Sequence, residues 1–153
     1  MFNQLDDKIV IFGMSCVGKT TFAKTMKDHD YFCFDGFFQW NLIETLGLSI
    51  TSNLNYVKQM CKGKFVLDGW HLSDKSGKYL PDLSCVYVLW SPYERIINQY
   101  RVPVHDPDEH RKMYKKWYLD VNYDVFQKVR YFENNGLFEE ISKEHFKHQL
   151  LVS

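Results

Sequence analysis

One eight-residue segment constrains the fold of this chain more than any other: Gly13-Met14-Ser15-Cys16-Val17-Gly18-Lys19-Thr20. It follows the apolar run at residues 9–12 and precedes residues 21–27, which have the pattern of a helix. Glycines let successive backbone N–H groups of such a loop turn toward one anion, and the positive end of the next helix faces the same anion. This order of strand, loop and helix predicts a binding site for the phosphate groups of a nucleoside triphosphate.

The motif also assigns roles to single residues. We expect Lys19 to reach the β- and γ-phosphates and the Thr20 hydroxyl to hold Mg²⁺, so ATP and Mg²⁺ are the expected cofactors. A Gly-rich turn that arose by chance is the alternative. The residues expected to surround the nucleotide are Gly13, Ser15, Cys16, Val17, Gly18, Lys19, Thr20 and Thr21.

Length and composition exclude several classes of protein. The 153 residues fit one domain, which we expect to span residues 1–153, and 45% of them are hydrophobic. The formal net charge of zero gives no overall positive field that would attract nucleic acid or a membrane surface. Residues 1–7 lack the basic region and apolar core of a signal peptide, so we expect none; the sequence also has no apolar run of membrane-spanning length and no C-x-x-C pair. We therefore expect a soluble, cytoplasmic protein without a membrane partner.

Short apolar segments alternate with longer amphipathic ones along the chain. This alternation predicts an α/β domain, with a parallel sheet of about five strands flanked by helices. The expected strands are residues 8–12, 31–34, 64–67, 85–90 and, more weakly marked, 137–141.

Helices are expected between and after these strands. Ser91, Asp106 and Ser142 are residue types that cap helix N-termini, and a proline follows each of the first two at the position where a helix begins. The expected helices are about residues 37–46, 52–62, 92–101 and 106–132, with a short final helix after Ser142.

Two aspartates end predicted strands. Asp35 follows the second strand and Asp68 the third, and the carboxyl ends of parallel strands are where ligands bind. We expect Asp68 to hold Mg²⁺, directly or through water, and Asp35 to accept the proton of an attacking hydroxyl. The two roles can also be exchanged, and each aspartate can be a plain turn residue.

The arginines gather in one part of the chain. Arg95, Arg101 and Arg111 lie in or beside the helices of residues 92–132, and the fourth arginine is Arg130. Guanidinium groups in this segment can close over a triphosphate and stabilise the transferring group. We therefore expect a lid here, with Arg95 and Arg101 as catalytic residues. Solvent-facing charge is the alternative, and it is our interpretation of Arg130.

Residues 36–63 are expected to cover the acceptor of the phosphate. They contain no arginine, which an acceptor with a phosphate or carboxylate group would require. Their aromatic side chains suit a flat neutral ring such as a nucleobase, although they also suit a helix core. The residues expected to line the acceptor site are Phe37, Phe38, Trp40 and Trp70.

Residues 111–118 interleave cations with aromatic side chains. Contact with a phosphate backbone together with base stacking would produce this pattern. A solvated basic face above an aromatic core stripe would produce it equally well, so the pattern leaves both interpretations open.

Taken together, residues 13–20, Asp35, Asp68, Arg95 and Arg101 resemble the small P-loop kinases: polynucleotide 5′-hydroxyl kinases, shikimate and gluconate kinases, and nucleoside or nucleotide kinases. The resemblance implies that the lysine and threonine of the motif are the family's phosphate-binding lysine and Mg²⁺ ligand. It further implies that Asp35 is the base found on the second strand of polynucleotide-kinase-like members, and that the two arginines belong to a lid.

The chain also departs from some members of this family. It lacks the acceptor arginine of nucleotide and shikimate kinases, and the Asp-Arg-Ser motif of deoxynucleoside kinases. The Asn-Lys-x-Asp motif of regulatory GTPases is absent as well. Its small size and many aromatic residues are similar to the phage kinases that phosphorylate 5-hydroxymethyluracil within DNA, which must extrude the target base.

These observations predict an enzyme, a Mg²⁺-dependent kinase that transfers the γ-phosphate of ATP to a hydroxyl of a nucleic-acid or nucleoside acceptor. A small-metabolite or nucleotide kinase is one alternative. The other is a non-catalytic nucleotide-binding switch, whose nucleotide state gates a protein partner.

Overall fold

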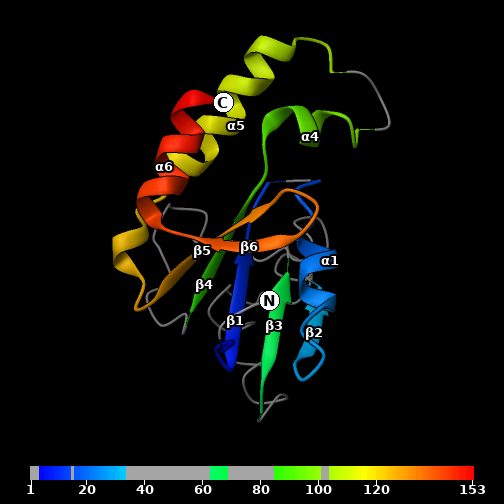
Figure 1. Cartoon of the computed structure of the whole chain (residues 1–153), viewed down its shortest axis with the longest axis vertical. Helices are drawn as coiled ribbons and strands as arrows, with labels where there is room; N and C mark the ends of the chain where they lie inside the picture. Colours follow the sequence, from blue (N-terminus) through cyan, green and yellow to red (C-terminus); the bar gives the residue numbers. More distant parts are fainter. Residues whose placement is uncertain (1–3, 15, 34–62, 69–84, 101–103) are drawn as a thin grey trace, which may run out of the picture.

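A six-stranded, mostly parallel sheet lies at the centre of the described structure (Figure 1). The computed structural model describes residues 4–14, 16–33, 63–68, 85–100 and 104–153. The strands are β1 (Lys8–Phe12), β2 (Asp30–Cys33), β3 (Phe65–Asp68), β4 (Val86–Trp90), β5 (Val129–Asn134) and β6 (Phe138–Ile141). Their order across the sheet is β2-β3-β1-β4-β5-β6, and only the β5–β6 pair is antiparallel.

The central strands are buried on both faces. Ile9–Phe12 of β1 and all residues of β3 and β4 are buried, which explains why these strands are nearly continuous apolar runs in the sequence. Ile11 lies opposite Asp68 on one side and Tyr87 on the other, so β1 is held between two parallel neighbours. The loop that follows β1 therefore starts from a fixed point of the core.

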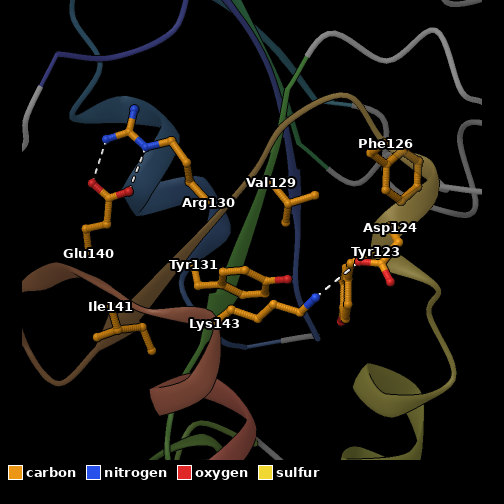
Figure 2. A pocket seen from close by; sticks show the side chains of 9 residues that line it. All are labelled: Tyr123, Asp124, Phe126, Val129, Arg130, Tyr131, Glu140, Ile141 and Lys143. Atoms are coloured by element: carbon orange, nitrogen blue, oxygen red, sulfur yellow. Dashed lines mark hydrogen bonds and ion pairs between the residues drawn. The ribbon is translucent and has the colours of Figure 1, made fainter.

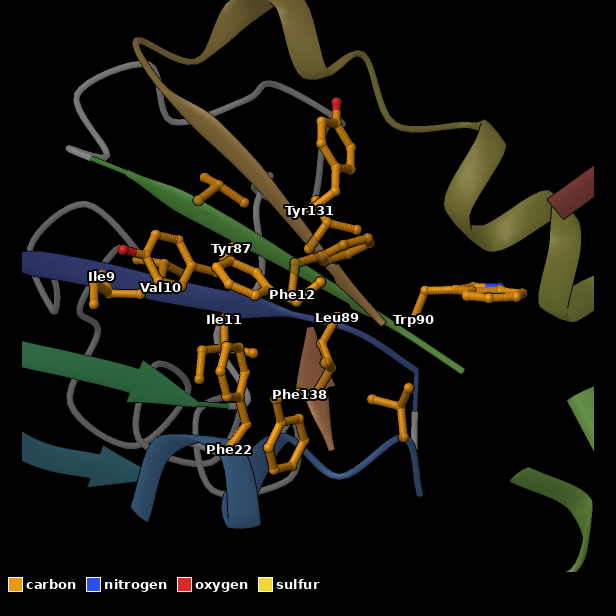
Figure 3. Close-up of a cluster of buried hydrophobic side chains, with 14 of the residues drawn as sticks. Ile9, Val10, Ile11, Phe12, Phe22, Tyr87, Leu89, Trp90, Tyr131 and Phe138 are labelled. Atoms are coloured by element: carbon orange, nitrogen blue, oxygen red, sulfur yellow. The ribbon is translucent and has the colours of Figure 1, made fainter. Parts of the chain in front are cut away.

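Helices cover both faces of this sheet. Consecutive residues of β5 show the division: Tyr131 contacts Phe146, with 4.9 Å between ring centroids, and Phe132 contacts Phe22 at 5.0 Å. Successive strand side chains point to opposite faces, so the helices that carry Phe146 and Phe22 cover opposite faces. Figure 3 shows Phe22 and Phe138 on one side of β1 and Tyr131 on the other. The helices are α1 (Lys19–Lys24), α4 (Tyr93–Ile97), α5 (Pro107–Leu119) and α6 (Lys143–Val152), with a 3-10 turn η1 (Tyr123–Val125).

The α/β class and the strand positions predicted from the sequence are confirmed. Each of the first four predicted strands is present with ends shifted by no more than one residue, and the fifth, at residues 137–141, is β6. The predicted parallel sheet of about five strands is mostly parallel and has six strands, with β6 running antiparallel to β5. The predicted helices at residues 37–46 and 52–62 lie outside the described residues.

The prediction of one helix through residue 132 is wrong. Helix α5 ends at Leu119, Asn122 caps η1, and residues 129–134 form β5, which pairs with β4. The segment from 129 to 134 has the alternation of a strand, because Arg130 and Phe132 face one side of the sheet and Tyr131 the other. Pairing along β4 decides its structure. The predicted lid of residues 92–132 therefore contains a sheet strand as well as helices.

Two of the three predicted N-caps are confirmed. Asp106 accepts a hydrogen bond from the Glu109 amide at 3.2 Å, and Ser142 accepts one from the His145 amide at 3.0 Å. Ser91 is not a cap: its hydroxyl donates instead to the Asn134 carbonyl at 2.9 Å, and α4 starts at Tyr93. Helix α4 ends at Ile97 and not near Arg101, which lies outside the described residues. Among the described helices, none has the length and apolar character needed to cross a membrane.

A network of charges ties the sheet together at the amino end of β5. The Asp6 carboxylate accepts hydrogen bonds from Tyr87 at 2.6 Å, Lys128 at 2.6 Å and Arg130 at 2.9 Å. Burial opposes ionisation of Asp6, but these hydrogen bonds outweigh it and hold the pKa of its carboxyl well below the ordinary value of 3.8. Arg130 also donates two hydrogen bonds to Glu140, each of 2.7 Å.

The interpretation of Arg130 as solvent-facing helix charge is wrong. Its side chain is only 10% exposed and lies on β5, where the guanidinium is 5.1 Å from the centroid of the Tyr87 ring. Paired carboxylates on both sides compensate the cost of burying this charge.

We expect Asp6→Asn to lower the free energy of unfolding at pH 7 by about 2 kcal/mol. The pKa of Asp6 is lower in the folded than in the unfolded protein, so its stabilising effect is fully present above about pH 3.8 and is lost progressively as the pH falls below that value toward the lower pKa of the folded state. Urea unfolding between pH 7 and pH 3 should therefore show a weaker pH dependence in the variant.

The matched control is Asp124→Asn, which breaks the ion pair of Asp124 with Lys143. Asp124 is 82% exposed, so this variant should stay within about 0.5 kcal/mol of the wild type. Equal losses in the two variants would contradict a special role of the Asp6 network.

Candidate functional site

The strand order places a change in chain direction at the carboxyl ends of β1 and β3. β1 and β3 are neighbours in the sheet. From β1 the chain continues to β2, on the far side of β3, whereas from β3 it continues to β4, on the far side of β1. In open parallel sheets, ligands bind where the chain leaves neighbouring strands in opposite directions. The loop of residues 13–18 and Asp68 both lie at this point of the sheet.

The loop after β1 is shaped by its two glycines. A Cβ atom at Gly13 would lie 2.8 Å from the Leu89 carbonyl oxygen and 2.8 Å from Val17 Cγ1, so only glycine fits there without a shift. Gly18 has φ of 102° where α1 begins, a conformation that residues with side chains rarely adopt. Cys16, with φ of 67°, adopts the left-handed region without that freedom. Such local strain persists only where surrounding contacts hold the loop.

Lys19 lies across the beginning of this loop. It is the first residue of α1, and its Nζ donates to the carbonyl oxygens of Gly13 and, at 3.3 Å, of Met14. The backbone carbonyls at the start of the loop thus fix the position of the ammonium group. Helix-opening N–H groups have no partner within the helix and favour an anion.

Thr20 and Asp68 meet at this end of the sheet. The Thr20 hydroxyl donates to Asp68 Oδ2 at 2.9 Å, and the Tyr31 hydroxyl donates to the same oxygen at 2.9 Å. Asp68 is only 3% exposed, so two hydroxyl groups stabilise a nearly buried carboxyl group. The sequence predicted Thr20 and Asp68 as partners at one site, and the fold brings them together from positions 48 residues apart.

The chemistry of Thr20 and Asp68 fits Mg²⁺. This ion prefers oxygen ligands and is commonly held by one or two carboxylates together with phosphate oxygens and water. In the part of the chain that the structure describes, no group of three or more His, Cys, Asp or Glu residues is placed to hold a metal. A cation at this position would therefore take most of its ligands from phosphate and water.

Two further side chains support the loop, and the sequence analysis did not identify them. The Met14 amide donates to the Tyr118 hydroxyl at 3.1 Å, and this hydroxyl donates in turn to the Leu89 carbonyl at 2.6 Å. Burial raises the pKa of Tyr118, which keeps its phenol protonated as a donor. On the other side of the loop, Asn134 Nδ2 donates to the Val17 carbonyl at 2.9 Å.

The sequence contains only weak local signals for the contacts that Tyr118 and Asn134 make with the loop. Tyr114 and Tyr118 are four residues apart and form a buried helix stripe, which predicts burial but not the partner of the phenol. The Asn135-Gly136 pair is typical of a hairpin turn and would have marked the β5–β6 connection. Tyr31, the second donor to Asp68, is an ordinary strand residue without any such signal.

Of the two arginines predicted to be catalytic, only Arg95 lies within the described residues. Arg95 is on the exposed face of α4, and its guanidinium nitrogens are 3.9 and 4.0 Å from the position a Cβ atom would take at Gly136. It thus lies beside the β5–β6 turn, whose Asn134 contacts the loop. Arg111 instead forms an ion pair with Glu94 at 2.8 Å, which connects α5 to α4.

Several predicted site residues lie outside the described part of the chain. They include one loop residue, the expected base, the other lid arginine and the expected acceptor lining: Ser15, Asp35, Arg101, Phe37, Phe38, Trp40 and Trp70. Their roles remain predictions from the sequence.

Residues 111–118 of α5, which interleave cations with aromatic side chains, show features of both interpretations. Tyr114 and Tyr118 are fully buried, as a core stripe requires. Lys112 forms an ion pair with Glu109 of the same helix and Lys116 with Asp120, the residue that caps its C-terminus, which reduces the positive surface available to a phosphate backbone. Trp117 remains 40% exposed and stacks on Phe12 with 4.3 Å between centroids.

A separate pocket of about 390 Å³ lies between η1, β5, β6 and the start of α6 (Figure 2). It includes Val129 and Tyr131, toward the amino end of β5 and so away from the loop after β1. Its charged side chains already form the pairs Arg130–Glu140 and Lys143–Asp124, which Figure 2 marks as dashed lines. This pocket therefore offers no converging free charges and is not our candidate site.

We expect Gly13→Ala to destabilise the protein by about 1–3 kcal/mol, because the added Cβ meets a backbone oxygen that cannot move freely. The matched control is Gly63→Ala, since an added Cβ at Gly63 meets no atom within 4 Å. Thermal and urea unfolding of both variants measure the difference. A Gly13→Ala protein as stable as Gly63→Ala would contradict the close packing of the loop against β4.

No protein-family model matches this chain, and no curated protein sequence matches it significantly. The geometry of the loop, of Asp68 and of their supporting side chains is therefore the ground on which a function can be argued.

Proposed function

We propose that this protein is an ATP-dependent kinase with a P-loop fold, which binds ATP and Mg²⁺ at residues 13–21 and transfers the γ-phosphate to a hydroxyl group. The hydrogen bond between Thr20 and Asp68 carries the proposal. It joins the hydroxyl that ends the loop motif to a carboxylate on the neighbouring strand. A chance Gly-rich turn gives no reason for this pairing.

The strand order adds independent support. A phosphate loop after the central β1, with an acidic residue at the end of adjacent β3, lies at the point where open parallel sheets bind ligands. The position of Lys19 at the mouth of the loop supports the same proposal. Few other ligands call for a cation, helix-opening amides and a buried carboxylate together.

The proposed roles follow from the chemistry of each side chain. Lys19 and the loop amides balance the negative charge that develops on the phosphates. Thr20 and Asp68 hold Mg²⁺, which when bound neutralises charge on the phosphate oxygens. Asp35 is proposed to accept the proton of the acceptor hydroxyl, and Arg95, with Arg101, to stabilise the transferring group.

We propose a nucleoside, or a base within a nucleic acid, as the acceptor. The absence of arginine from residues 36–63 and the aromatic residues there support a neutral ring over a charged small molecule. The ion-paired lysines of α5 lend less support to extensive contact with a phosphate backbone. A small-metabolite kinase and a non-catalytic switch remain the outcomes against which the proposal is tested.

We expect Lys19→Ala to reduce phosphate transfer by at least about 100-fold, because it removes the cation at the phosphates. The assay uses γ-labelled ATP, Mg²⁺ and a panel of nucleosides, mononucleotides, small sugars and acids, 5′-hydroxyl oligonucleotides, and duplex DNA with and without 5-hydroxymethyluracil. Lys24→Ala, an exposed lysine at the end of the same helix, is the matched control and should retain full activity.

The panel also separates the alternatives. Label on a nucleoside or on DNA supports the proposed acceptor, and its position distinguishes a 5′ end from a base. Label on a sugar or acid alone would make the protein a small-metabolite kinase. Tight ATP binding without any transfer would favour the switch, and full activity of Lys19→Ala would overturn the assignment of the loop.

We expect Asp68→Asn to weaken the apparent affinity for Mg²⁺ about 10- to 100-fold. The amide oxygen can still accept from Thr20 and Tyr31, so the fold should persist while the negative charge is lost. A Mg²⁺ titration of ATP binding measures the effect. Asp28→Asn, an exposed carboxylate between α1 and β2, should behave as the wild type; equal Mg²⁺ affinity in both variants would remove Asp68 from the metal site.

A further inference from the structure

Asn134, the last residue of β5, joins three parts of the structure that are distant in sequence. Its Nδ2 donates to the Val17 carbonyl at 2.9 Å, and its Oδ1 accepts from the Gly136 amide at 3.1 Å. Its backbone carbonyl accepts from the Ser91 hydroxyl at 2.9 Å. One amide partner is a carbonyl and the other an N–H, so the orientation of the side-chain amide is defined chemically.

The contact with Val17 sets the orientation of one peptide group in the phosphate loop. The described chain has no cis peptide bonds, and in a trans peptide the C=O and the following N–H point in opposite directions. Since the Val17 carbonyl points to Asn134, the N–H of Gly18 points away from Asn134. Asn134 thus controls the direction of an amide in the segment that we propose to bind phosphate.

The packing at this contact is tight. A Cβ atom at Gly18 would lie 2.7 Å from Asn134 Nδ2 and 3.7 Å from the Phe138 ring. The β5–β6 hairpin therefore packs directly against the loop at Gly18. Position 18 requires glycine for two reasons: its φ is positive, and a side chain there would collide with Asn134.

The same residue connects the loop to the helix that carries Arg95. Ser91, which is 1% exposed, lies between β4 and α4, and its hydroxyl is held by Asn134. The guanidinium of Arg95 lies about 4 Å from the Cβ position at Gly136, in the turn that the Asn134 side chain closes. A displacement of Asn134 would therefore change both the conformation of the loop and the packing around Arg95.

We infer that Asn134 is a positioning residue for nucleotide binding: it holds the Val17–Gly18 peptide so that the Gly18 N–H faces the phosphates. This inference rests on the proposed function. On this inference the β5–β6 turn affects phosphate binding indirectly, by orienting the loop, and does not contact the nucleoside part of the ligand.

The experiment compares Asn134→Ala with Asn135→Ala in the full-length protein. Asn135 lies in the same turn, but its side chain contacts Glu139 and the Leu137 amide. Calorimetry measures the binding of MgATP and of inorganic tripolyphosphate, which has phosphates but no base or sugar. We expect Asn134→Ala to weaken both ligands about tenfold, and Asn135→Ala to change either by less than twofold.

A second variant, Asn134→Asp, keeps the acceptor for Gly136 but places a carboxylate oxygen against the Val17 carbonyl. It should fold, because the side chain keeps its size, and it should weaken both ligands more than Asn134→Ala does. In turnover assays, Asn134→Ala should raise the KM for MgATP about tenfold while kcat changes less than threefold. A general structural defect would instead lower both binding and kcat in proportion to lost stability.

The remaining outcomes would contradict either the role of Asn134 or the proposed function. Equal effects of Asn134→Ala and Asn135→Ala, or wild-type affinity in Asn134→Asp, would overturn the role of Asn134. Weaker MgATP with unchanged tripolyphosphate would show that the turn contacts the nucleoside part, which also overturns it. A folded wild-type protein that binds neither ligand would overturn the proposed function itself.

Discussion

The position of β1 between two parallel neighbours is the constraint on which the rest of this structure depends. Its apolar side chains are buried on both faces, and β3 and β4 take its backbone hydrogen bonds on both sides. The loop at residues 13–18 therefore leaves the core at a defined point, and close contact with the Leu89 carbonyl fixes its first glycine. A strained residue such as Cys16 can persist in a loop that is held this firmly.

The two ends of the sheet use polar groups differently. At the amino end of β5, Arg130 forms ion pairs with both Asp6 and Glu140, an arrangement that stabilises the fold and leaves little charge for a ligand. At the carboxyl ends of β1 and β3, hydroxyl groups bind Asp68 and backbone carbonyls orient Lys19. Hydroxyl groups and loop carbonyls thus hold a carboxyl group and an ammonium group in place at one end of the sheet, which suits a site for phosphate and a divalent cation.

Sequence reasoning located the strands well, because buried parallel strands are short continuous apolar runs. It failed at β5, where capping signals at Asp106 were extended into a single helix through residue 132. The failure has a physical origin: the strand pattern of Val129–Asn134 is only six residues long, and its pairing with β4, a tertiary contact, decides its structure. The cap at Ser91 failed for the same reason, since its hydroxyl found a partner on Asn134.

By itself, the sequence determined the Gly-x-x-x-x-Gly-Lys-Thr motif, the positions of five strands and the identity of Lys19, Thr20 and Asp68 as candidate site residues. These features depend on residue type at short spacing, which local chemistry controls. Only the tertiary structure decided what surrounds the loop: Thr20 meets Asp68 across 48 residues, Met14 meets Tyr118 across 104, and Val17 meets Asn134 across 117. No local pattern encodes such contacts, because they arise when sheet order brings the carboxyl ends of distant strands to one edge.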